Sequence, residues 1–148
     1  MVFTAFIIGT AGSGKSHLTS SFAERMKEEK QKVAVMNLDP GVATLPYSPE
    51  IDVRDYITIE SVMEEYGLGP NGALLMAADL IAGEIGRLKR EVEEVEPDIL
   101  IVDTPGQMEL FAFRVSGPYI AQAISDEPKA IVYLFDSVFS SNPLNYVS

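Results

Sequence analysis

The chain has 148 residues, which is enough for one domain with a substantial buried core. Hydrophobic residues make up 47% of it, charged residues 22%, and the formal net charge is −11 at pH 7. Because this excess of negative charge repels phosphate, it argues against independent binding to nucleic acid or to an anionic membrane surface. The absence of cysteine excludes disulfides and thiolate metal sites. With no apolar run near the roughly 20 residues that a membrane helix needs, we expect a cytoplasmic protein.

The first predicted element is a short buried strand, Phe3–Ile8, which leads into a phosphate-binding motif. Gly9-Thr10-Ala11-Gly12-Ser13-Gly14-Lys15-Ser16 fills every fixed position of the pattern G-x-x-x-x-G-K-[ST]. A helix is predicted from Lys15 to about Glu29. The glycines let several backbone N–H groups converge on one anion, and the helix start adds the positive end of its dipole. This strand–loop–helix order predicts a site for nucleotide phosphates.

Within this motif each residue type has a chemical role. Lys15 offers a mobile positive charge to the β- and γ-phosphates, and Ser16 offers a hydroxyl to Mg²⁺. His17 lies within reach of an α-phosphate, although a lone histidine more often packs or caps, and we assign it no catalytic role. The residues expected to cradle the phosphates with their backbone are Gly12, Ser13 and Gly14.

The second predicted strand, Lys32–Asn37, ends in a segment with two interpretations. Asp39 follows this strand, so its carboxylate is expected at the sheet edge where open α/β sheets place ligands. There it would bind the water shell of a metal or position an attacking water. Asp39-Pro40-Gly41 is also a common turn sequence, so both interpretations stay open. We predict a loop over residues 39–56.

Two helices are predicted before the third strand. Thr58–Tyr66 is a short helix with Thr58 as its N-cap. A long helix from about Ala73 to Val95 follows, because apolar residues recur there at helical spacing. Its interior glycines, Gly83 and Gly86, are interpreted as tolerated. Gly69-Pro70-Asn71-Gly72 is predicted as a tight turn in which Asn71 caps the long helix.

The third strand, Asp98–Asp103, brings a second group of candidate residues to the sheet edge. Asp103 is placed to hold Mg²⁺, directly or through water. Gly106 has no side chain, so its N–H is able to approach a γ-phosphate closely. Gln107 offers an amide that orients an attacking water, and Glu109 a carboxylate that positions it or takes its proton. Alternatively, the segment is an ordinary strand-to-helix turn with Asp103 as a cap.

A helix over Gln107–Ile124 and a fourth strand, Ala130–Phe135, complete the pattern. Strands that alternate with helices predict an α/β fold, a doubly wound and mostly parallel sheet with helices on both faces. Only Asp136–Ser148 follows the fourth strand, too little for another helix–strand unit. We therefore expect the chain to be part of a longer protein or to complete its sheet by association.

Taken together, these motifs resemble those of the GPN-loop GTPases, which are P-loop NTPases of the SIMIBI class. The similar segments occur in family order along nearly the whole chain: Gly9–Ser16, Asn37-Leu38-Asp39-Pro40, Pro46-Tyr47, Asp52-Val53-Arg54, Gly69-Pro70-Asn71-Gly72, Asp103-Thr104-Pro105-Gly106-Gln107-Met108-Glu109 and Asn145-Tyr146-Val147-Ser148. The resemblance implies that residues 1–148 form the N-terminal part of a single GTPase domain, a truncated G domain. The family's guanine-reading motif, Asn-Lys-x-Asp, is absent from these residues.

The resemblance also implies ligands and partners. Members of this family form homodimers, bind GTP or GDP with Mg²⁺, and reach across with the Gly-Pro-Asn loop to the partner's nucleotide. Asn71 would then complete the site in trans, while Gln107 and Glu109 hold the water. Eukaryotic members are linked to assembly and nuclear import of RNA polymerase II, which suggests a client in the RNA polymerase assembly machinery. The family usually has a small hydroxyl residue where His17 stands, and guanine preference rests wholly on the resemblance.

The leading hypothesis is a Mg²⁺-dependent, homodimeric GTPase that acts as a switch or assembly factor. A phosphotransferase, such as a nucleotide or polynucleotide kinase, shares the phosphate loop and is the alternative. It would need an acceptor site and an arginine-bearing lid, whereas the five arginines are not clustered in this way. A third hypothesis is an assembly factor whose output is binding, with slow hydrolysis as a timer.

Overall fold

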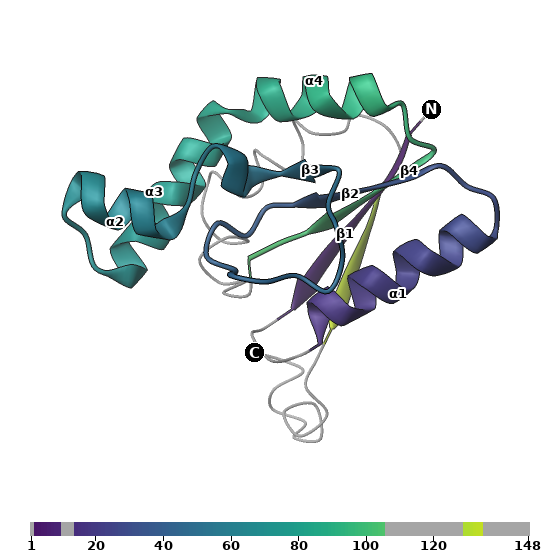
Figure 1. Cartoon of the computed structure of the whole chain (residues 1–148), viewed down its shortest axis with the longest axis horizontal. Coiled ribbons are helices and arrows are strands. Elements are labelled where there is room, and N and C mark those ends of the chain that lie inside the picture. The colour runs from purple at the N-terminus through teal and green to yellow at the C-terminus, as the bar shows by residue number, and fades with distance from the viewer. Residues whose placement is uncertain (1, 10–13, 106–128, 135–148) are drawn as a thin grey trace.

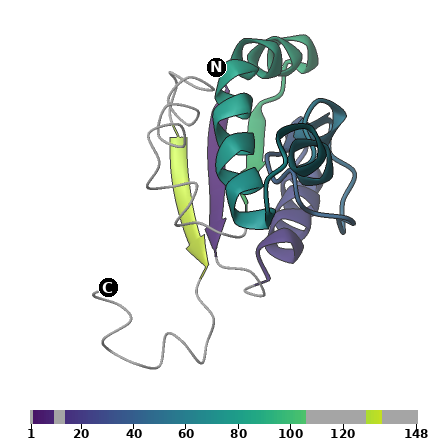
Figure 2. The same ribbon diagram turned by 90° about the vertical axis from the view of Figure 1, so that its left-hand side faces the viewer.

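A five-stranded parallel sheet organises the computed structural model, which describes residues 2–9, 14–105 and 129–134. The strands lie in the order β3-β2-β4-β1-β5, and every neighbouring pair is parallel. Their bounds are β1 Phe3–Gly9, β2 Val33–Asn37, β3 Ile51–Asp52, β4 Ile99–Asp103 and β5 Lys129–Leu134. The fourth predicted strand thus begins one residue earlier than expected, and Figure 2 shows it outermost, beside β1.

The strand register brings polar residues to one edge of the sheet. Asp103 of β4 lies opposite Ile7 of β1 and Asn37 of β2, and Asn37 in turn lies opposite Asp52 of β3. Since Asn37, Asp52 and Asp103 each end their strand, these three polar side chains are brought to the edge where α/β folds bind ligands.

Helices cover both faces of the sheet, as the predicted doubly wound fold requires (Figure 1). Helix α1, Lys15–Glu28, packs on the face that bears Ile7, Val35 and Ile101. The opposite face bears Phe6, Met36 and Val102 and is covered by the other helices. These are α2 Ile59–Tyr66, α3 Pro70–Gly83 and α4 Ile85–Val95. Strands buried on both faces explain the nearly continuous apolar runs of the sequence.

The segment over residues 39–56 is more structured than the predicted loop. It contains β3 and a 3₁₀ helix, η1, over Val53–Asp55. Asp52 caps η1, because its side chain accepts a hydrogen bond from the backbone N–H of Arg54 at 3.0 Å. Ile51 and Val53 are fully buried. A two-residue strand is too short to produce a recognisable alternation, which is why the pattern missed it.

The predicted N-cap of α2 is confirmed. The Thr58 side chain accepts a hydrogen bond from the backbone of Ser61, and the Ser61 side chain accepts one from the backbone of Thr58, forming a capping box. Gly67 ends the helix at a φ of 63°, in the left-handed region that favours glycine.

The single long helix predicted over residues 73–95 is wrong. Two helices, α3 and α4, meet at Gly83 and Glu84, where the backbone of Glu84 leaves helical geometry. Asn71 is not the cap either, because α3 begins at Pro70 with Gly69 as its N-cap. Proline suits the first helical position, since it lacks an N–H that would stay unpaired there. The apolar stripe continued through the break and concealed it.

Other predicted elements lie outside the described residues, namely the helix over Gln107–Ile124, Phe135 of the last strand and the segment Asp136–Ser148. Within the described part of the chain, no helix is long and apolar enough to span a lipid bilayer.

Candidate nucleotide-binding site

The lysine of the phosphate loop and the aspartate that ends β4 form a buried ion pair. Lys15 is the first residue of α1, and its Nζ lies 2.6 Å from Oδ1 of Asp103, the last residue of β4. The two residues are 7% and 1% exposed. Charges this deeply buried are stable only when paired. The structure therefore brings together the two residues on which the predicted phosphate and metal site depends.

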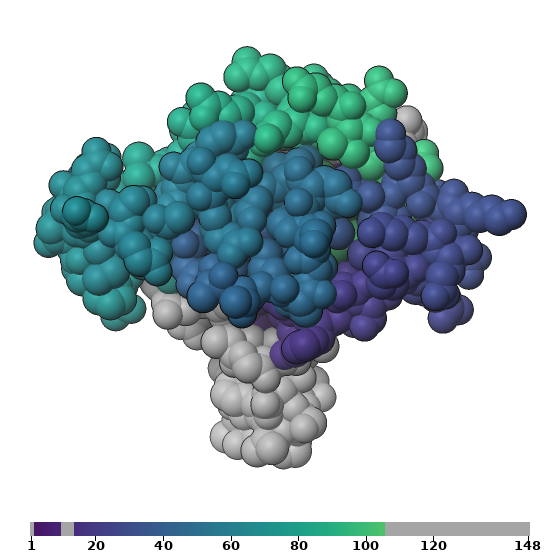
Figure 3. Space-filling model, in the orientation of Figure 1, coloured from purple at the N-terminus to yellow at the C-terminus, as the bar shows by residue number. Residues whose placement is uncertain are grey.

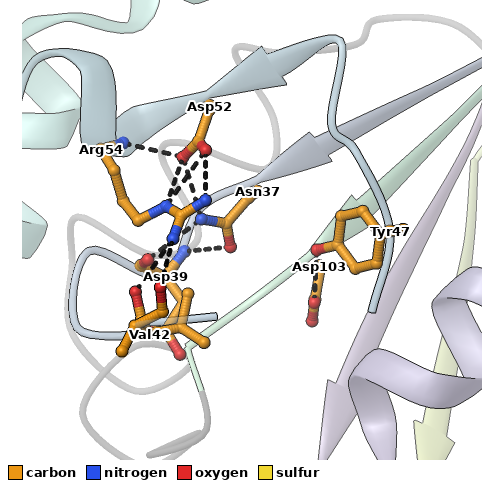
Figure 4. Close-up of polar contacts among 8 residues, drawn as sticks. Asn37, Asp39, Val42, Tyr47, Asp52, Arg54 and Asp103 are labelled. Atoms are coloured by element: carbon orange, nitrogen blue, oxygen red, sulfur yellow. Dashed lines mark hydrogen bonds and ion pairs between the residues drawn. The ribbon is translucent and has the colours of Figure 1, made fainter. Parts of the chain in front are cut away.

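Two hydroxyl groups contact the other oxygen of the same carboxylate. Ser16 Oγ donates to Asp103 Oδ2 at 3.0 Å, and the Tyr47 hydroxyl donates to Oδ2 at 2.6 Å. Figure 4 shows the Tyr47 side chain reaching Asp103 from the loop that follows β2. We call Lys15, Ser16, Tyr47 and Asp103 the phosphate-site cluster. Its carboxylate accepts three hydrogen bonds, out of about four that a carboxylate accommodates.

Tyr47 remains a hydrogen-bond donor in this environment. Burial, and then the negative charge of Asp103, raise the pKa of the Tyr47 hydroxyl well above its usual value. The neutral phenol is therefore the form that meets the carboxylate. No sequence motif indicated this contact, and the one signal for Tyr47 was its place in the segments that resemble the GPN-loop GTPases.

The backbone geometry around the phosphate loop fits its predicted role. Gly14 caps α1 at a φ of 86°, a left-handed conformation that a side chain would strain. On the other side, the Thr104 hydroxyl donates to the carbonyl of Ile7 at 2.7 Å and ties the end of β4 to β1. This bond fixes the strand end that bears Asp103. His17 is exposed, and Gly12 and Ser13 lie outside the described residues.

Asp39 takes part in the turn that its sequence allowed. Its Oδ1 accepts a hydrogen bond from the Gly41 N–H at 2.9 Å. The buried Asn37 amide holds the same turn, because its Oδ1 accepts from the Asp39 N–H at 3.0 Å and its Nδ2 donates to the Asp39 carbonyl at 3.1 Å. The side chain of Asp39 is half-buried. Turn formation leaves its second carboxylate oxygen for other partners, so the metal or water role of Asp39 stays a prediction.

Arg54 anchors the chain just after this turn, although no sequence motif indicated a role for it. Its guanidinium binds the Asp52 carboxylate at 2.7 Å and 3.1 Å, and its Nη1 donates to the carbonyls of Val42 and Ala43 at 3.1 Å and 3.2 Å. Figure 4 shows this guanidinium between the Asp52 carboxylate and the loop that carries Val42. We call Asn37, Asp39, Asp52 and Arg54 the loop cluster.

The charges of the loop cluster stabilise one another. Burial alone would raise the pKa of Asp52, but hydrogen bonds from Arg54 and from Asn37 outweigh it and lower that pKa below its usual value. Hydrogen bonding to Asp52 likewise raises the pKa of Arg54. Both groups are therefore charged at neutral pH.

The oxygen donors of the phosphate-site cluster fit Mg²⁺ held together with a nucleotide. Ser16 and Asp103 supply a hydroxyl and a carboxylate, the hard ligands that Mg²⁺ prefers. In the described part of the chain, no group of three or more His, Cys, Asp and Glu side chains is arranged to hold a metal ion. Mg²⁺ commonly uses one or two protein ligands, substrate phosphates and water, so this sparse donor set suits it.

The remaining predicted residues lie elsewhere. Asn71 is exposed in the first turn of α3. Helix α2 and the start of α3 form one end of the molecule, away from the beginning of α1 (Figures 1 and 3). Asn71 is therefore not part of the phosphate-site cluster of its own chain. Gly106, Gln107 and Glu109 lie outside the described residues.

Comparisons with known proteins identify the family of this chain. A family model described as a conserved hypothetical ATP binding protein matches residues 7–148. The curated relatives found across nearly the whole chain are named GPN-loop GTPases. The chain belongs to the GPN-loop GTPase family. GPN-loop GTPase 1 of Saccharomyces cerevisiae is 38% identical over an alignment 148 residues long, which covers 98% of this chain and 38% of that protein.

An archaeal relative is similar in both sequence and structure. GPN-loop GTPase PAB0955 of Pyrococcus abyssi is 40% identical over an alignment 141 residues long, which covers 94% of this chain and 55% of that protein. A crystal structure of PAB0955, described as a GTPase in apo form, matches with a TM-score of 0.84 and 39% identity, over 99% of this chain and 58% of the other. The chain thus spans 38% to 55% of the length of these two curated relatives.

A more distant structure shares the fold. The signal recognition particle receptor FtsY of Elizabethkingia anophelis matches with a TM-score of 0.54 at 14% identity, over 99% of this chain and 44% of the other. At this identity the match bears on the arrangement of sheet and helices, not on chemistry.

Proposed function

We propose that this GPN-loop protein binds and hydrolyses GTP with Mg²⁺, and that the chain carries the phosphate and metal half of the site. The observation that supports this most directly is the meeting of Lys15, Ser16 and Asp103 at the carboxyl end of the sheet. These three groups come from the phosphate loop and from the neighbouring strand β4. Their chemistry is that of a triphosphate and its metal.

Each residue of the cluster has a separate task in this function. Lys15 moves its charge from Asp103 to the β- and γ-phosphates, while Ser16 and Asp103 hold the Mg²⁺ site. Bound Mg²⁺ would supply charge stabilisation for the phosphoryl oxygens. Asp39 is proposed to position the attacking water or the metal's water shell. The corresponding roles of Gly106, Gln107 and Glu109 remain predictions. Catalysis of this type consists mainly of positioning and electrostatic stabilisation.

The preference between guanine and adenine is tested by competition. The family description names ATP, whereas the relatives are named GTPases. A fluorescent GDP analogue bound to the protein at its natural length is displaced with increasing GTP or ATP, in buffer containing Mg²⁺. We expect GTP to compete at a concentration at least about tenfold lower than ATP, since guanine and adenine differ in several hydrogen-bonding groups. Equal or better competition by ATP would reject guanine specificity.

Hydrolysis is tested separately from binding. Phosphate release is followed with GTP and Mg²⁺, then with EDTA, and then with added nucleoside or polynucleotide acceptors. Free phosphate that depends on Mg²⁺ supports a GTPase. Phosphate that appears on an acceptor instead would favour the phosphotransferase.

We also propose that the active form is a homodimer in which Asn71 acts in trans. The exposed position of Asn71 at the start of α3, which lies away from the beginning of α1 in the same chain, supports this arrangement. A complementation experiment tests it: Lys15→Ala and Asn71→Ala are each inactive alone. In a heterodimer, the intact Lys15 site of one subunit receives the intact Asn71 of the other. Equal mixing should restore about a quarter of the wild-type turnover, because half of the dimers are mixed and each has one intact site. If Asn71 acted in cis, mixing would restore nothing.

The output of the cycle is proposed to be a change in assembly. In a nucleotide-gated switch, the dimer or a protein client binds with different affinity in the GTP and GDP forms. Analytical ultracentrifugation with GDP and with a non-hydrolysable GTP analogue measures this for the dimer. If the dimer affinity is identical with GDP and with the GTP analogue, the dimer is not what the nucleotide controls. The nucleotide-dependent partner would then be a protein client, such as the RNA polymerase assembly machinery.

A further inference from the structure

Tyr47 shares a carboxylate oxygen with the proposed metal site. Its hydroxyl lies 2.6 Å from Asp103 Oδ2, within the short range of hydrogen bonds to charged oxygens, and Ser16 Oγ lies 3.0 Å from the same atom. A metal held by Ser16 and Asp103 has to approach this oxygen, directly or through its water. Mg²⁺ requires ligands at about 2.0–2.1 Å in nearly ideal octahedral geometry. The Tyr47 hydroxyl therefore stands where metal ligands would be placed.

The loop that carries Tyr47 is held in two different ways. At its beginning, Arg54 binds the carbonyls of Val42 and Ala43, and these bonds involve no group of the phosphate-site cluster. Near its end, the backbone N–H of Glu50 donates to the Val35 carbonyl at 3.0 Å, and the Val35 N–H donates to the Glu50 carboxylate at 2.7 Å. Both anchors are internal to the fold and need not change when a ligand binds.

Between these anchors, the contacts of the loop reach the phosphate-binding elements. Tyr47 packs against the apolar cluster under α1, and Ser20 of α1 donates to the Pro46 carbonyl at 3.3 Å. The neighbouring residues Thr44 and Ser48 are exposed. The Tyr47 hydroxyl thus connects a short, partly exposed stretch to the carboxylate that also pairs with Lys15.

We propose that Tyr47 is a metal-responsive clasp: its hydroxyl competes with Mg²⁺ for Asp103, so that binding of the Mg²⁺–nucleotide releases residues 44–48 from the site. The proposal rests on the proposed function, because it assumes a nucleotide in this cluster. Residues 44–48 would then move between two fixed points, the carbonyls held by Arg54 and the backbone of Glu50. It also makes Tyr47 a positioning residue that tunes metal affinity rather than a catalytic one.

The first test compares nucleotide affinity with and without the metal. Tyr47→Phe removes the hydroxyl and keeps the ring that packs under α1. Dissociation constants for GDP and for a non-hydrolysable GTP analogue are measured by calorimetry in Mg²⁺ and in EDTA, for the protein at its natural length. We expect the affinity gain due to Mg²⁺ to be about tenfold larger in Tyr47→Phe than in the wild type, since a competing hydrogen bond to a charged group is lost. Affinity in EDTA should stay within about twofold.

Ser20→Ala is the matched control. It removes a bond between the same loop and α1 but leaves Asp103 untouched. The clasp predicts that its Mg²⁺-dependent gain equals that of the wild type. An equal increase in both variants would mean that loosening the loop in any way improves affinity, and would overturn the competition between Tyr47 and the metal.

The second test observes the movement directly. Residues 1–148 contain no cysteine, so Ser48→Cys gives this part of the protein a single attachment point for an environment-sensitive fluorophore beside Tyr47. Emission should change when nucleotide is added with Mg²⁺ and stay constant when it is added with EDTA. In the Tyr47→Phe background the starting emission should already be shifted toward the Mg²⁺-bound value.

Failure of the clasp and failure of the proposed function give different results. An unchanged or smaller Mg²⁺-dependent gain in Tyr47→Phe, with nucleotide still bound, overturns the clasp alone. So does a label that responds equally with and without Mg²⁺. A wild-type protein that binds no nucleotide in either buffer would refute the proposed function, and the clasp with it.

Discussion

The phosphate-site cluster and the loop cluster stand on neighbouring strand ends, yet their polar groups are committed to different degrees. In the loop cluster, the Nε, Nη1 and Nη2 atoms of Arg54 all donate to Asp52 or to loop carbonyls. In the phosphate-site cluster, Lys15, Ser16 and Tyr47 all converge on one carboxylate. In the proposed nucleotide complex Lys15 turns to a phosphate, Ser16 turns to the metal, and Asp103 exchanges Tyr47 for the metal. We call the fixed contacts of the loop cluster the frame. The groups of the phosphate-site cluster, in contrast, are able to exchange partners.

This difference explains how one short loop can be both fixed and responsive. Asp39 lies on the frame side, where Asn37 and Gly41 define its backbone and one carboxylate oxygen. Tyr47 lies on the exchangeable side. A residue that positions water or a metal shell needs a fixed backbone, because a displacement of about 1 Å costs orders of magnitude in rate. A residue that reports ligand binding needs a contact that the ligand replaces.

The largest expected effect is a loss of nucleotide affinity, which a change in the phosphate-site cluster should cause. Lys15→Ala should weaken nucleotide affinity by at least about a hundredfold, because a charge-assisted contact to the phosphates is lost. Lys27→Ala is the matched control, since Lys27 lies on the same helix with its side chain 48% exposed. Calorimetric titration with GDP measures both. Nearly wild-type affinity in Lys15→Ala would show that the phosphate-site cluster binds no phosphate.

The second effect concerns the frame and should appear in stability. Arg54→Ala should lower the free energy of unfolding by about 2 kcal/mol, because Asp52 and two loop carbonyls lose their donor. Urea denaturation without nucleotide measures this change. Arg25→Ala serves as the control, since its pair with Glu29 is exposed and 3.7 Å long, and should contribute under about 0.5 kcal/mol.

A result in which Arg54→Ala weakens nucleotide binding strongly and leaves stability unchanged would contradict the frame. Arg54 would then act on the ligand itself, and the two clusters would have to be regarded as one site.

The third effect uses pH to isolate Asp52. Because the folded-state pKa of Asp52 lies below its unfolded value, its contribution to stability is present above the unfolded pKa, about 3.9, and is lost as pH falls through the folded pKa. The stability difference between wild type and Asp52→Asn should therefore be about 1–2 kcal/mol at pH 7 and shrink steadily below about pH 4. Urea midpoints across this range measure it. A difference that stays constant down to pH 2 would mean that the charge of Asp52 contributes nothing.

Most of the phosphate-site cluster was predictable from the sequence and most of the loop cluster was not, for a physical reason. Phosphate binding requires fixed residue types at fixed spacing, so Lys15, Ser16 and the strand before Asp103 were predictable from the motif and from hydrophobic runs. Arg54 and Tyr47 act through contacts that join distant segments, and no local pattern announces such pairs. The parallel sheet was predictable because buried strands are long and apolar. The break between α3 and α4 was not, because the apolar stripe continues across it.

The smallest effect tests a local feature next to the frame. Thr58 caps α2, and the following N–H, of Ile59, donates to the Pro40 carbonyl at 3.1 Å, so the start of this helix also holds the turn after Asp39. Thr58→Ala should cost about 1 kcal/mol of unfolding free energy through the lost cap, measurable by urea denaturation, while Thr58→Ser should cost much less. Nucleotide affinity should stay within about twofold, because the Arg54 and Asn37 contacts hold the turn without the cap. A larger loss of affinity than of stability would show that the frame extends into α2, and that the fixed side of the loop is wider than the loop cluster alone.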